Sequence, residues 1–241
     1  MSADNTRSVT SPLDLLRCGD LELLGRMPWS SNQTFLGRLT HQEHAALAIY
    51  KPRRGERALW DFPPGTLCQR EVAAYLVSEA LGWSIVPPTV LREGPGGGGM
   101  AQLFVDHDPD QHYFTLRERY PNRFRQFALF DVITNNADRK SGHCLLDGDG
   151  HLWGIDHGLS FHVAPKLRTV IWDFEGEPIH HGLLGELAAM ADTLAGDLAS
   201  PLGRLLAPGE VEATAGRLAW LLEFEVFPPP LSEYPYPWPM V

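Results

Sequence analysis

The feature that most constrains this chain is a short hairpin flanked by acidic loops. Two apolar stretches, 143–146 and 151–155, are separated by Asp-Gly-Asp-Gly at 147–150, and Asp-Gly pairs are typical of tight turns between antiparallel strands. Such a hairpin brings its two outer ends together. Asp138 and Asp156 are therefore predicted to face one small space, although 18 positions separate them in the sequence.

The polar residues around these two aspartates are of the kinds that phosphoryl transfer requires. In that reaction one carboxylate orients the accepting hydroxyl, another holds Mg²⁺, and a cation neutralises phosphate charge. Lys140 supplies a cation at the same mouth of the hairpin, and Asn136 and His143 add further polar side chains. The local sequence thus favours a site that handles phosphate.

Four stretches together resemble the phosphatidylinositol 3-/4-kinase-like superfamily, with the type II phosphatidylinositol 4-kinases and related bacterial kinase-like proteins nearest. Asp138-Arg139-Lys140 resembles the catalytic loop, and the stretch 155–161, Ile-Asp-His-Gly-Leu-Ser-Phe, resembles the metal-binding loop Ile-Asp-Asn-Gly-Leu-Ala-Phe. Tyr50-Lys51-Pro52 resembles the strand end that carries the ATP-binding lysine, and 70–76 resembles the helix that pairs with it. The pieces occur in the family's order over roughly residues 22–162, which no single motif would establish.

The resemblance implies an α+β, two-lobed protein-kinase-like fold. A β-rich N-lobe over 1–106 would bind nucleotide, and an α-rich C-lobe over 107–241 would carry the catalytic and metal-binding loops and a Pro-rich C-terminal tail at 228–241. A Thr66–Gln69 capping box is expected to open one helix, and Gly82 to end it. The patterns predict strands at 21–27, 35–40, 44–51, 86–91 and 100–105, and helices at 13–17, 67–81, 123–135, 183–198 and 211–224.

The resemblance also assigns roles around the hairpin. Asp138 corresponds to the catalytic aspartate, which accepts or orients the substrate hydroxyl. Arg139 is expected to orient the loop, and Lys140 to face the transferring phosphate. Asp156 corresponds to a ligand of the divalent cation, Mg²⁺ or Mn²⁺.

His143 departs from the family pattern, which commonly has Asn at this position as the second metal ligand. Imidazole can bind a metal, but it suits Mn²⁺ or Zn²⁺ better than Mg²⁺, which prefers oxygen. Asn135 and Asn136 are candidates for a substitute oxygen ligand. The alternative is that His143 is a strand-end histidine with a satisfied hydrogen bond.

Lysine is rare in this sequence, which makes its positions informative. Only Lys51, Lys140 and Lys166 occur among 20 basic residues, and the first two fall where the resemblance implies phosphate contacts. Lys51 is expected to bind ATP, and Glu71, at the edge of an apolar helix stripe, to pair with it. The alternative for Glu71 is a solvated first-turn carboxylate stabilised by the helix dipole.

Two further segments would contact the nucleotide in the resembled fold. The strand–loop–strand around 30–34 lies where kinases cover the ATP phosphates, and hydroxyl and backbone N–H groups there can bind phosphate oxygens. An ordinary polar hairpin turn is the alternative. The segment 102–106 would lie near the adenine. The residues assigned to nucleotide binding in these two segments are Ser30, Ser31, Asn32, Gln102, Phe104 and Val105.

Composition narrows the partners and the location. A net charge of −10 argues against nucleic acid, whose phosphates require a basic surface, and mildly against an anionic membrane surface. No apolar run approaches the length of a membrane-spanning helix, so stable membrane insertion is not expected. The first twelve residues lack an apolar signal core, which makes a cytoplasmic location the default expectation.

The function that these residues favour is ATP-dependent phosphoryl transfer to a hydroxyl of a lipid, a small polyol or a protein. A second hypothesis is a nucleotide-binding pseudokinase that acts through its lobe surfaces or through a protein partner at the Pro-rich tail, and the departure at His143 favours it. A third is a metal-dependent hydrolase that uses His143, Asp156, His157 and His162. It is disfavoured because it leaves the upstream strands and Lys51 unexplained.

Overall fold

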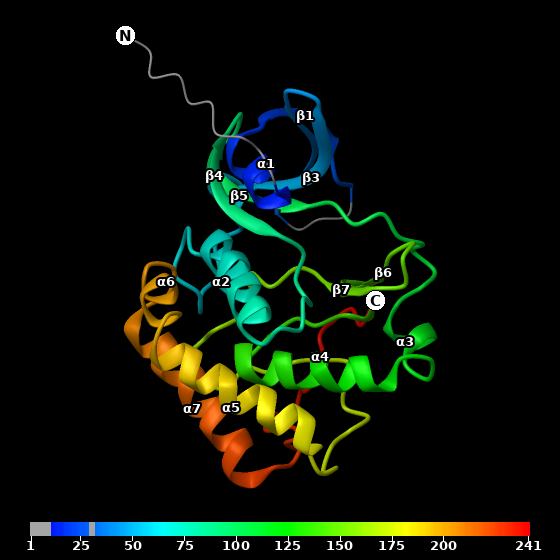
Figure 1. Cartoon of the computed structure of the whole chain (residues 1–241), viewed down its shortest axis with the longest axis vertical. Helices are drawn as coiled ribbons and strands as arrows, with labels where there is room; N and C mark the ends of the chain where they lie inside the picture. The colour runs from blue at the N-terminus through cyan, green and yellow to red at the C-terminus, as the bar shows by residue number, and fades with distance from the viewer. Residues whose placement is uncertain (1–10, 29–31) are drawn as a thin grey trace. The chain divides into compact units, whose positions relative to one another are not determined.

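The structure is a computed structural model, and it describes residues 11–28 and 32–241. The chain forms two compact units (Figure 1). Unit 1 takes the described residues up to Ala58 together with Pro88–Phe104, and unit 2 takes Leu59–Pro87 and Val105–Val241. Unit 1 is built on an antiparallel sheet and unit 2 is rich in helices, as the sequence predicts.

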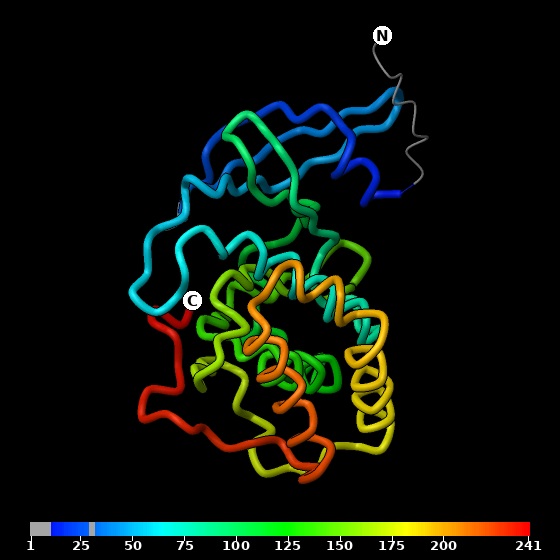
Figure 2. Tube along the Cα trace, turned by 90° about the vertical axis from the view of Figure 1, so that its left-hand side faces the viewer, coloured from blue at the N-terminus to red at the C-terminus, as the bar shows by residue number. Residues whose placement is uncertain are grey.

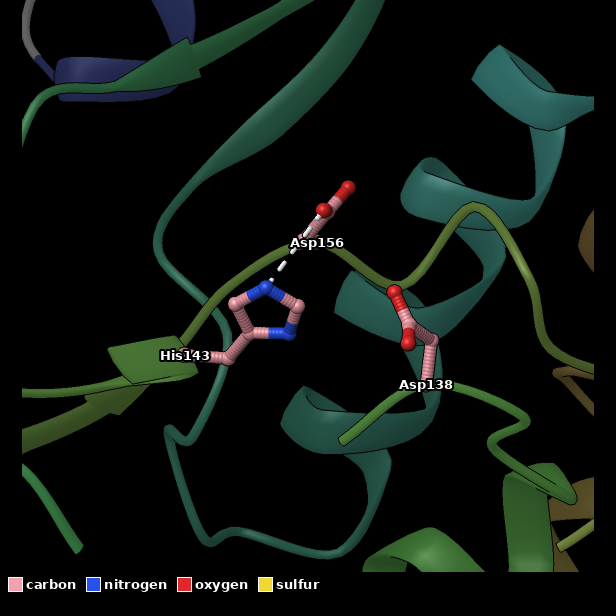
Figure 3. A group of neighbouring side chains, drawn as sticks. All are labelled: Asp138, His143 and Asp156. Carbon is pink, nitrogen blue, oxygen red and sulfur yellow. Dashed lines mark ion pairs between the residues drawn. The ribbon is translucent and has the colours of Figure 1, made fainter. Parts of the chain in front are cut away.

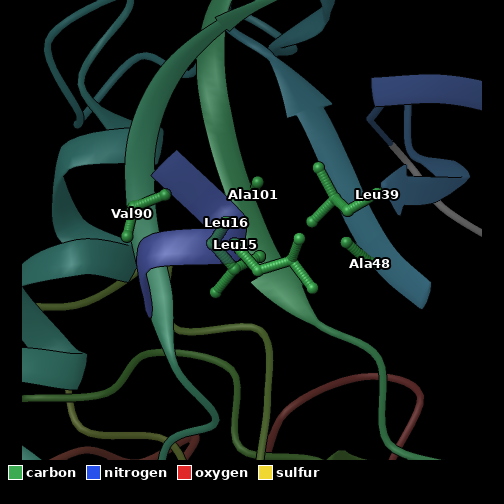
Figure 4. Close-up of a cluster of buried hydrophobic side chains, with 6 residues drawn as sticks. All are labelled: Leu15, Leu16, Leu39, Ala48, Val90 and Ala101. Atoms are coloured by element: carbon green, nitrogen blue, oxygen red, sulfur yellow. The ribbon is translucent and has the colours of Figure 1, made fainter. Parts of the chain in front are cut away.

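Unit 1 is a five-stranded antiparallel sheet with the strand order β1-β2-β3-β5-β4. In the trace of Figure 2 its blue N-terminal segments lie beside the green segment from later in the chain. A short helix, α1 (Pro12–Cys18), packs on it and is capped by Ser11, whose Oγ accepts the N–H of Asp14. Leu15 and Leu16 of this helix join side chains of the sheet in a buried apolar cluster (Figure 4). The strands are β1 (Asp20–Arg26), β2 (Phe35–His41), β3 (His44–Pro52), β4 (Thr89–Gly94) and β5 (Gly97–Leu103).

The glycine-rich stretch 94–99 lies largely inside the sheet, whereas the predicted strands at 86–91 and 100–105 left it outside. Gly94 pairs with Gly97 across a tight turn, and Gly97–Gly99 begin strand β5. The Lys51 backbone explains why residue 99 is a glycine, because a Cβ at this position would lie 2.3 Å from the Lys51 carbonyl oxygen. Glycine therefore lets β5 approach β3 closely.

Unit 2 contains four main helices, and each was predicted to within a few residues. Its short hairpin pairs Cys144 with Gly154 and Leu146 with Leu152, as the Asp-Gly turn predicts. No helix in the described part of the chain combines the length and apolar character needed to cross a membrane. The elements are α2 (Leu67–Ala80), α3 (Tyr113–Leu116), α4 (Pro121–Thr134), β6 (Cys144–Leu146), β7 (Leu152–Gly154), α5 (His181–Ala195), α6 (Ala199–Gly203) and α7 (Pro208–Phe224).

Helix α2 belongs to unit 2, whereas the sequence-based division placed it in the N-lobe. The reason is a buried ionic anchor: the Arg70 guanidinium is 2.5 Å from a carboxylate oxygen of Glu210 on α7 and donates to the Ser160 carbonyl. The predicted capping box does not form: the Thr66 hydroxyl donates to the carbonyl of Pro63 and accepts from Nε of Arg70, and it makes no capping hydrogen bond. Gly82, with φ of +68°, lies just past the helix end, as predicted.

Candidate active site

The catalytic loop begins where α4 ends in a left-handed residue, Asn135, with φ of 52°. Asparagine tolerates this conformation better than most residues. The Asn135 amide nitrogen donates to the carbonyls of His162 and Ala164, and its oxygen accepts the N–H of Lys166. Asn135 thereby holds the loop that follows the metal-binding segment, and its oxygen is engaged in that contact.

Asn136 sets the position of Asp138, the aspartate predicted to be catalytic. Its side-chain oxygen accepts the N–H of Asp138 at 3.0 Å, and its amide nitrogen donates to Asp131. Asn136 is completely buried. Both asparagines that the sequence offered as substitute metal ligands therefore have their side-chain oxygens occupied by backbone N–H groups.

Arg139 joins the catalytic loop to the metal-binding loop. Its guanidinium, fully buried, forms an ion pair with Asp131 at 2.9 Å and donates to the Ile155 carbonyl at 3.2 Å and the His143 carbonyl at 3.4 Å. These contacts fix the backbone immediately before Asp156. The geometry supports the loop-orienting role that the resemblance implies for Arg139.

Asp138, His143 and Asp156 come together, as the hairpin predicts (Figure 3). One ligand atom from each lies within 4.8 Å of the others, and the Nε2 atom of His143 is 3.6 Å from Oδ2 of Asp156. All three side chains are partly exposed. Two carboxylates and an imidazole at this spacing form a donor set that a divalent cation such as Mn²⁺ fits.

The Asp138 carboxyl has a raised pKa. Burial raises the pKa of Asp138 to about 6, an effect that Lys140 opposes and Asp156 reinforces. The Lys140 ammonium lies 3.2 Å from the Asp138 carboxylate, with both side chains about three-quarters buried. A carboxyl with this pKa is largely ionised at neutral pH and remains a usable base.

Glu71 holds the metal-binding loop from the side of α2. Its side chain is almost fully buried, and Oε2 accepts the N–H of His157 at 2.9 Å. The solvated alternative for Glu71 is therefore wrong. The predicted ion pair between Glu71 and Lys51 joins residues of the two units and stays a prediction.

The residues predicted to bind nucleotide lie in unit 1, apart from Glu71 and Val105. Lys51 pairs with Met100 across β3 and β5. The Gln102 side chain is buried and donates to Thr89 Oγ1. The Phe104 N–H donates to the Leu47 carbonyl, so backbone contacts to an adenine would come from groups further along the chain, beginning at Val105.

The predicted phosphate-covering loop is described only in part. Ser30 and Ser31 lie outside the described residues. The Asn32 side-chain oxygen accepts the N–H of Arg57 at 2.8 Å, and the Gln33 N–H donates to the Gly55 carbonyl. Gln33 thus joins this loop to the short 3₁₀ turn η1 (Arg53–Gly55) that follows β3, and Asn32 joins it to Arg57 just beyond that turn.

Sequence reasoning missed Asp131, which anchors Arg139. This carboxylate is fully buried and also accepts the Thr169 hydroxyl at 3.0 Å. A signal was present, because Asp131 stands between Phe130 and Val132 in an otherwise apolar stretch of helix. A charge at such a position is rarely buried unless it is paired.

The part of the chain that holds these loops matches a known family. The family described as Phosphatidylinositol 3- and 4-kinase matches residues 89–180, which include the catalytic and metal-binding loops. Phosphatidylinositol 4-kinase gamma 4 of Oryza sativa subsp. japonica is 34% identical over 108 residues. That match covers 37% of this chain and 19% of the plant protein.

Solved structures support the fold. The chain superposes on the Golgi casein kinase with a TM-score of 0.51 at 15% identity, over 88% of this chain and 72% of the other. The structure of hydra Fam20 with sugar gives a TM-score of 0.54 at 12% identity, over 90% and 89% of the two chains. These likenesses confirm the predicted two-lobed kinase-like α+β fold.

A bacterial protein matches nearly the whole chain. Protein Rv2133c of Mycobacterium tuberculosis is 41% identical over 260 residues, which cover 93% of this chain and 94% of the relative. The similarity runs through both units, so it concerns the whole chain rather than one motif. The chain therefore belongs to the family of Protein Rv2133c, and its residues 89–180 match the family described as Phosphatidylinositol 3- and 4-kinase.

Proposed function

We propose that this protein is an active phosphotransferase that moves the γ-phosphoryl group of ATP to a hydroxyl group, with a divalent cation bound by Asp138, His143 and Asp156. One observation carries the proposal: the ligand atoms of these residues lie within 4.8 Å of one another, beside the orienting contacts of Arg139. A histidine and two aspartates without a shared ligand would have no need to bring their ligand atoms this close together.

Asp138 acts as the base in this reaction. Its carboxylate accepts the proton of the attacking hydroxyl while the acceptor oxygen forms a bond to the γ-phosphorus and the bond from that phosphorus to the β-phosphate bridging oxygen breaks. ADP leaves with the bridging oxygen. Because Asn136 holds the Asp138 backbone at 3.0 Å, the carboxylate is positioned before the substrate arrives.

Asp156 and His143 supply the other metal ligands, and Lys140 supplies a mobile cation. A bound divalent cation neutralises the negative charge on the phosphates. His143 binds through neutral imidazole, which suits Mn²⁺ better than Mg²⁺. Lys140 pairs with Asp138 at 3.2 Å in the structure, and in the proposed reaction its ammonium would turn to the transferring phosphoryl group.

The acceptor belongs to the class of hydroxyl compounds. The net charge of −10 favours a small polyol or a protein hydroxyl over a headgroup in an anionic membrane. Hydra Fam20, one of the proteins of similar fold, was solved with sugar, which is a reason to include sugars among the acceptors tested.

The second candidate is a nucleotide-binding pseudokinase. Two features favour it. The imidazole of His143 is a poor ligand for Mg²⁺, and the ion pair with Lys140 makes the Asp138 carboxylate a weaker base. Incubation with γ-labelled ATP, Mg²⁺ or Mn²⁺ and a lysate, followed by mass analysis of products, separates the two. The active enzyme gives a labelled product that Asp138→Asn abolishes, whereas a pseudokinase gives a nucleotide-induced stabilisation and no product.

A further inference from the structure

The C-terminal tail, residues 228–241, is extended and packs on unit 2, where its backbone reaches the candidate active site (Figure 1). The carbonyl of Met240 accepts the N–H of Ser141 at 2.8 Å. The carbonyl of Pro235 accepts the N–H of Thr169 at 3.0 Å and the indole N–H of Trp172 at 3.3 Å. Two tail carbonyls thus meet two loops that are distant in sequence.

Both loops belong to the catalytic machinery. Ser141 is fully buried and opens the 3₁₀ turn η2 (Ser141–His143), which ends at the candidate metal ligand His143. Thr169 lies in a parallel bridge with Arg139, where the Arg139 N–H donates to the Arg168 carbonyl and the Val170 N–H donates to the Arg139 carbonyl. The tail therefore contacts Ser141, two residues after Arg139, and Thr169, which is bridged to Arg139.

The tail makes these contacts mainly through its backbone. The Trp238 side chain is 88% exposed and that of Tyr234 is 73% exposed, so neither contributes much buried apolar area. A buried N–H such as that of Ser141 needs an acceptor, and the Met240 carbonyl supplies it. Loss of this carbonyl would leave the Ser141 N–H without its acceptor and remove one of the hydrogen bonds that hold the turn ending at His143.

We propose that Pro235–Met240 are positioning residues of the active site, whose carbonyls hold η2 and the Arg139 bridge so that Asp138 and His143 reach one metal ion together. This inference rests on the proposed function. It assigns the tail a part in the site, in contrast to a strap that blocks the site or a free segment that recruits a protein partner.

Three shortened chains test the proposal in a graded way. A chain ending at Met240 keeps an oxygen on that residue, a chain ending at Pro239 loses the acceptor of the Ser141 N–H, and a chain ending at Tyr234 loses both carbonyls. Mn²⁺ affinity is measured by electron paramagnetic resonance, with Asp156→Asn as the baseline for binding elsewhere. Amide exchange at Ser141 and Thr169 is measured alongside, and circular dichroism checks that each chain is folded.

We expect the chain ending at Met240 to match the full chain. The chain ending at Pro239 should exchange the Ser141 amide faster and bind Mn²⁺ ~10-fold more weakly, as is typical when a partner that supports a metal ligand is lost. ATP turnover should fall in parallel, and the Thr169 amide should lose protection only in the chain ending at Tyr234. Trp238→Ala is the matched control, because it keeps every carbonyl and removes only an exposed ring.

The contrary outcomes are distinct. Unchanged Mn²⁺ affinity and unchanged Ser141 exchange in the chain ending at Pro239 would overturn the proposal. A rise in ATP turnover would also overturn it, because the tail would then be an inhibitory strap. Absence of turnover in the full chain would count against the proposed function alone, since Mn²⁺ affinity and amide exchange still compare the variants.

Discussion

The Arg139 guanidinium and the Asp131 carboxylate form an ion pair at 2.9 Å in which neither side chain is exposed to solvent. The pair lies behind the catalytic loop, and the same guanidinium donates to the Ile155 carbonyl next to Asp156. A charge buried this deeply is stable only while its partner is present. The two loops of the candidate site are therefore joined by an interaction that also holds the fold.

Asp131→Ala should destabilise the protein by ~3–5 kcal/mol, because it leaves a buried guanidinium without its counter-charge. Urea unfolding of the variant measures the loss. Arg117→Ala is the matched control, since Arg117 pairs with Asp173 at 3.1 Å in an exposed setting, where such pairs contribute ~0–1 kcal/mol. Equal losses in the two variants would contradict a special role for the buried pair.

Asp138→Asn should abolish turnover and yet stabilise the folded protein at pH 7.5 without metal. Burial raises the pKa of Asp138 to about 6 from the model-peptide value of 3.8. Folding therefore favours the protonated form, so this group's contribution to stability falls as pH rises from about 4 through about 6. A shift of ~2 pKa units corresponds to at most ~3 kcal/mol.

Thermal melts of wild type and Asp138→Asn from pH 4 to pH 8 check the sign. The advantage of the variant should grow between pH 4 and pH 7 and then level off. An Asn variant that is less stable than wild type at pH 7.5 would show that the Lys140 contact outweighs the burial of Asp138.

How much of this site is readable from sequence depends on how local each contact is. The hairpin was predictable because the Asp-Gly turn encodes it within a few residues, and the meeting of Asp138 with Asp156 follows from that turn. The start of β5 was not predictable, because Gly99 is needed where this strand passes close to Lys51, some 48 positions away in the sequence. A glycine run alone reads as flexible, and only the partner strand shows its purpose.

The supports of the catalytic loop were also out of reach of sequence reasoning. Met240 contacts Ser141 through backbone atoms, which leave no trace in side-chain type. The Thr66–Gln69 pattern predicts a capping box, but no capping hydrogen bond forms, and the Thr66 hydroxyl donates to the Pro63 carbonyl. Local patterns predicted the elements and the reacting groups, whereas the contacts that position those groups join segments far apart in the chain.

Lys51→Ala should reduce the rise in melting temperature that saturating ATP with Mn²⁺ produces. A ligand that binds only the folded state stabilises it by mass action, so the loss of a phosphate contact lowers the shift. Lys166→Ala is the matched control: Lys166 pairs with Asp61 at 2.7 Å and has no predicted nucleotide contact. Differential scanning fluorimetry with and without ATP compares the two. An equal shift in wild type and Lys51→Ala would remove this lysine from the nucleotide site.

His143→Asn tests why an imidazole stands where the resembled family commonly has asparagine. The Nε2 atom lies 3.6 Å from Asp156, which suits a shared metal ion. An amide oxygen in its place is a harder ligand, so the ratio of Mn²⁺-supported to Mg²⁺-supported turnover should shift toward Mg²⁺. ATP turnover measured across a range of each metal gives that ratio, and His151→Asn is the control, since His151 contacts the Ser84 carbonyl.

Three results of the His143→Asn experiment have different meanings. A shift toward Mg²⁺ with turnover retained identifies His143 as a ligand that sets metal preference in an active kinase. No change in either metal preference or turnover makes it a structural residue at the start of β6. Turnover that appears only in the variant identifies the natural chain as a pseudokinase, because the single missing element would then be an oxygen ligand for Mg²⁺ at residue 143.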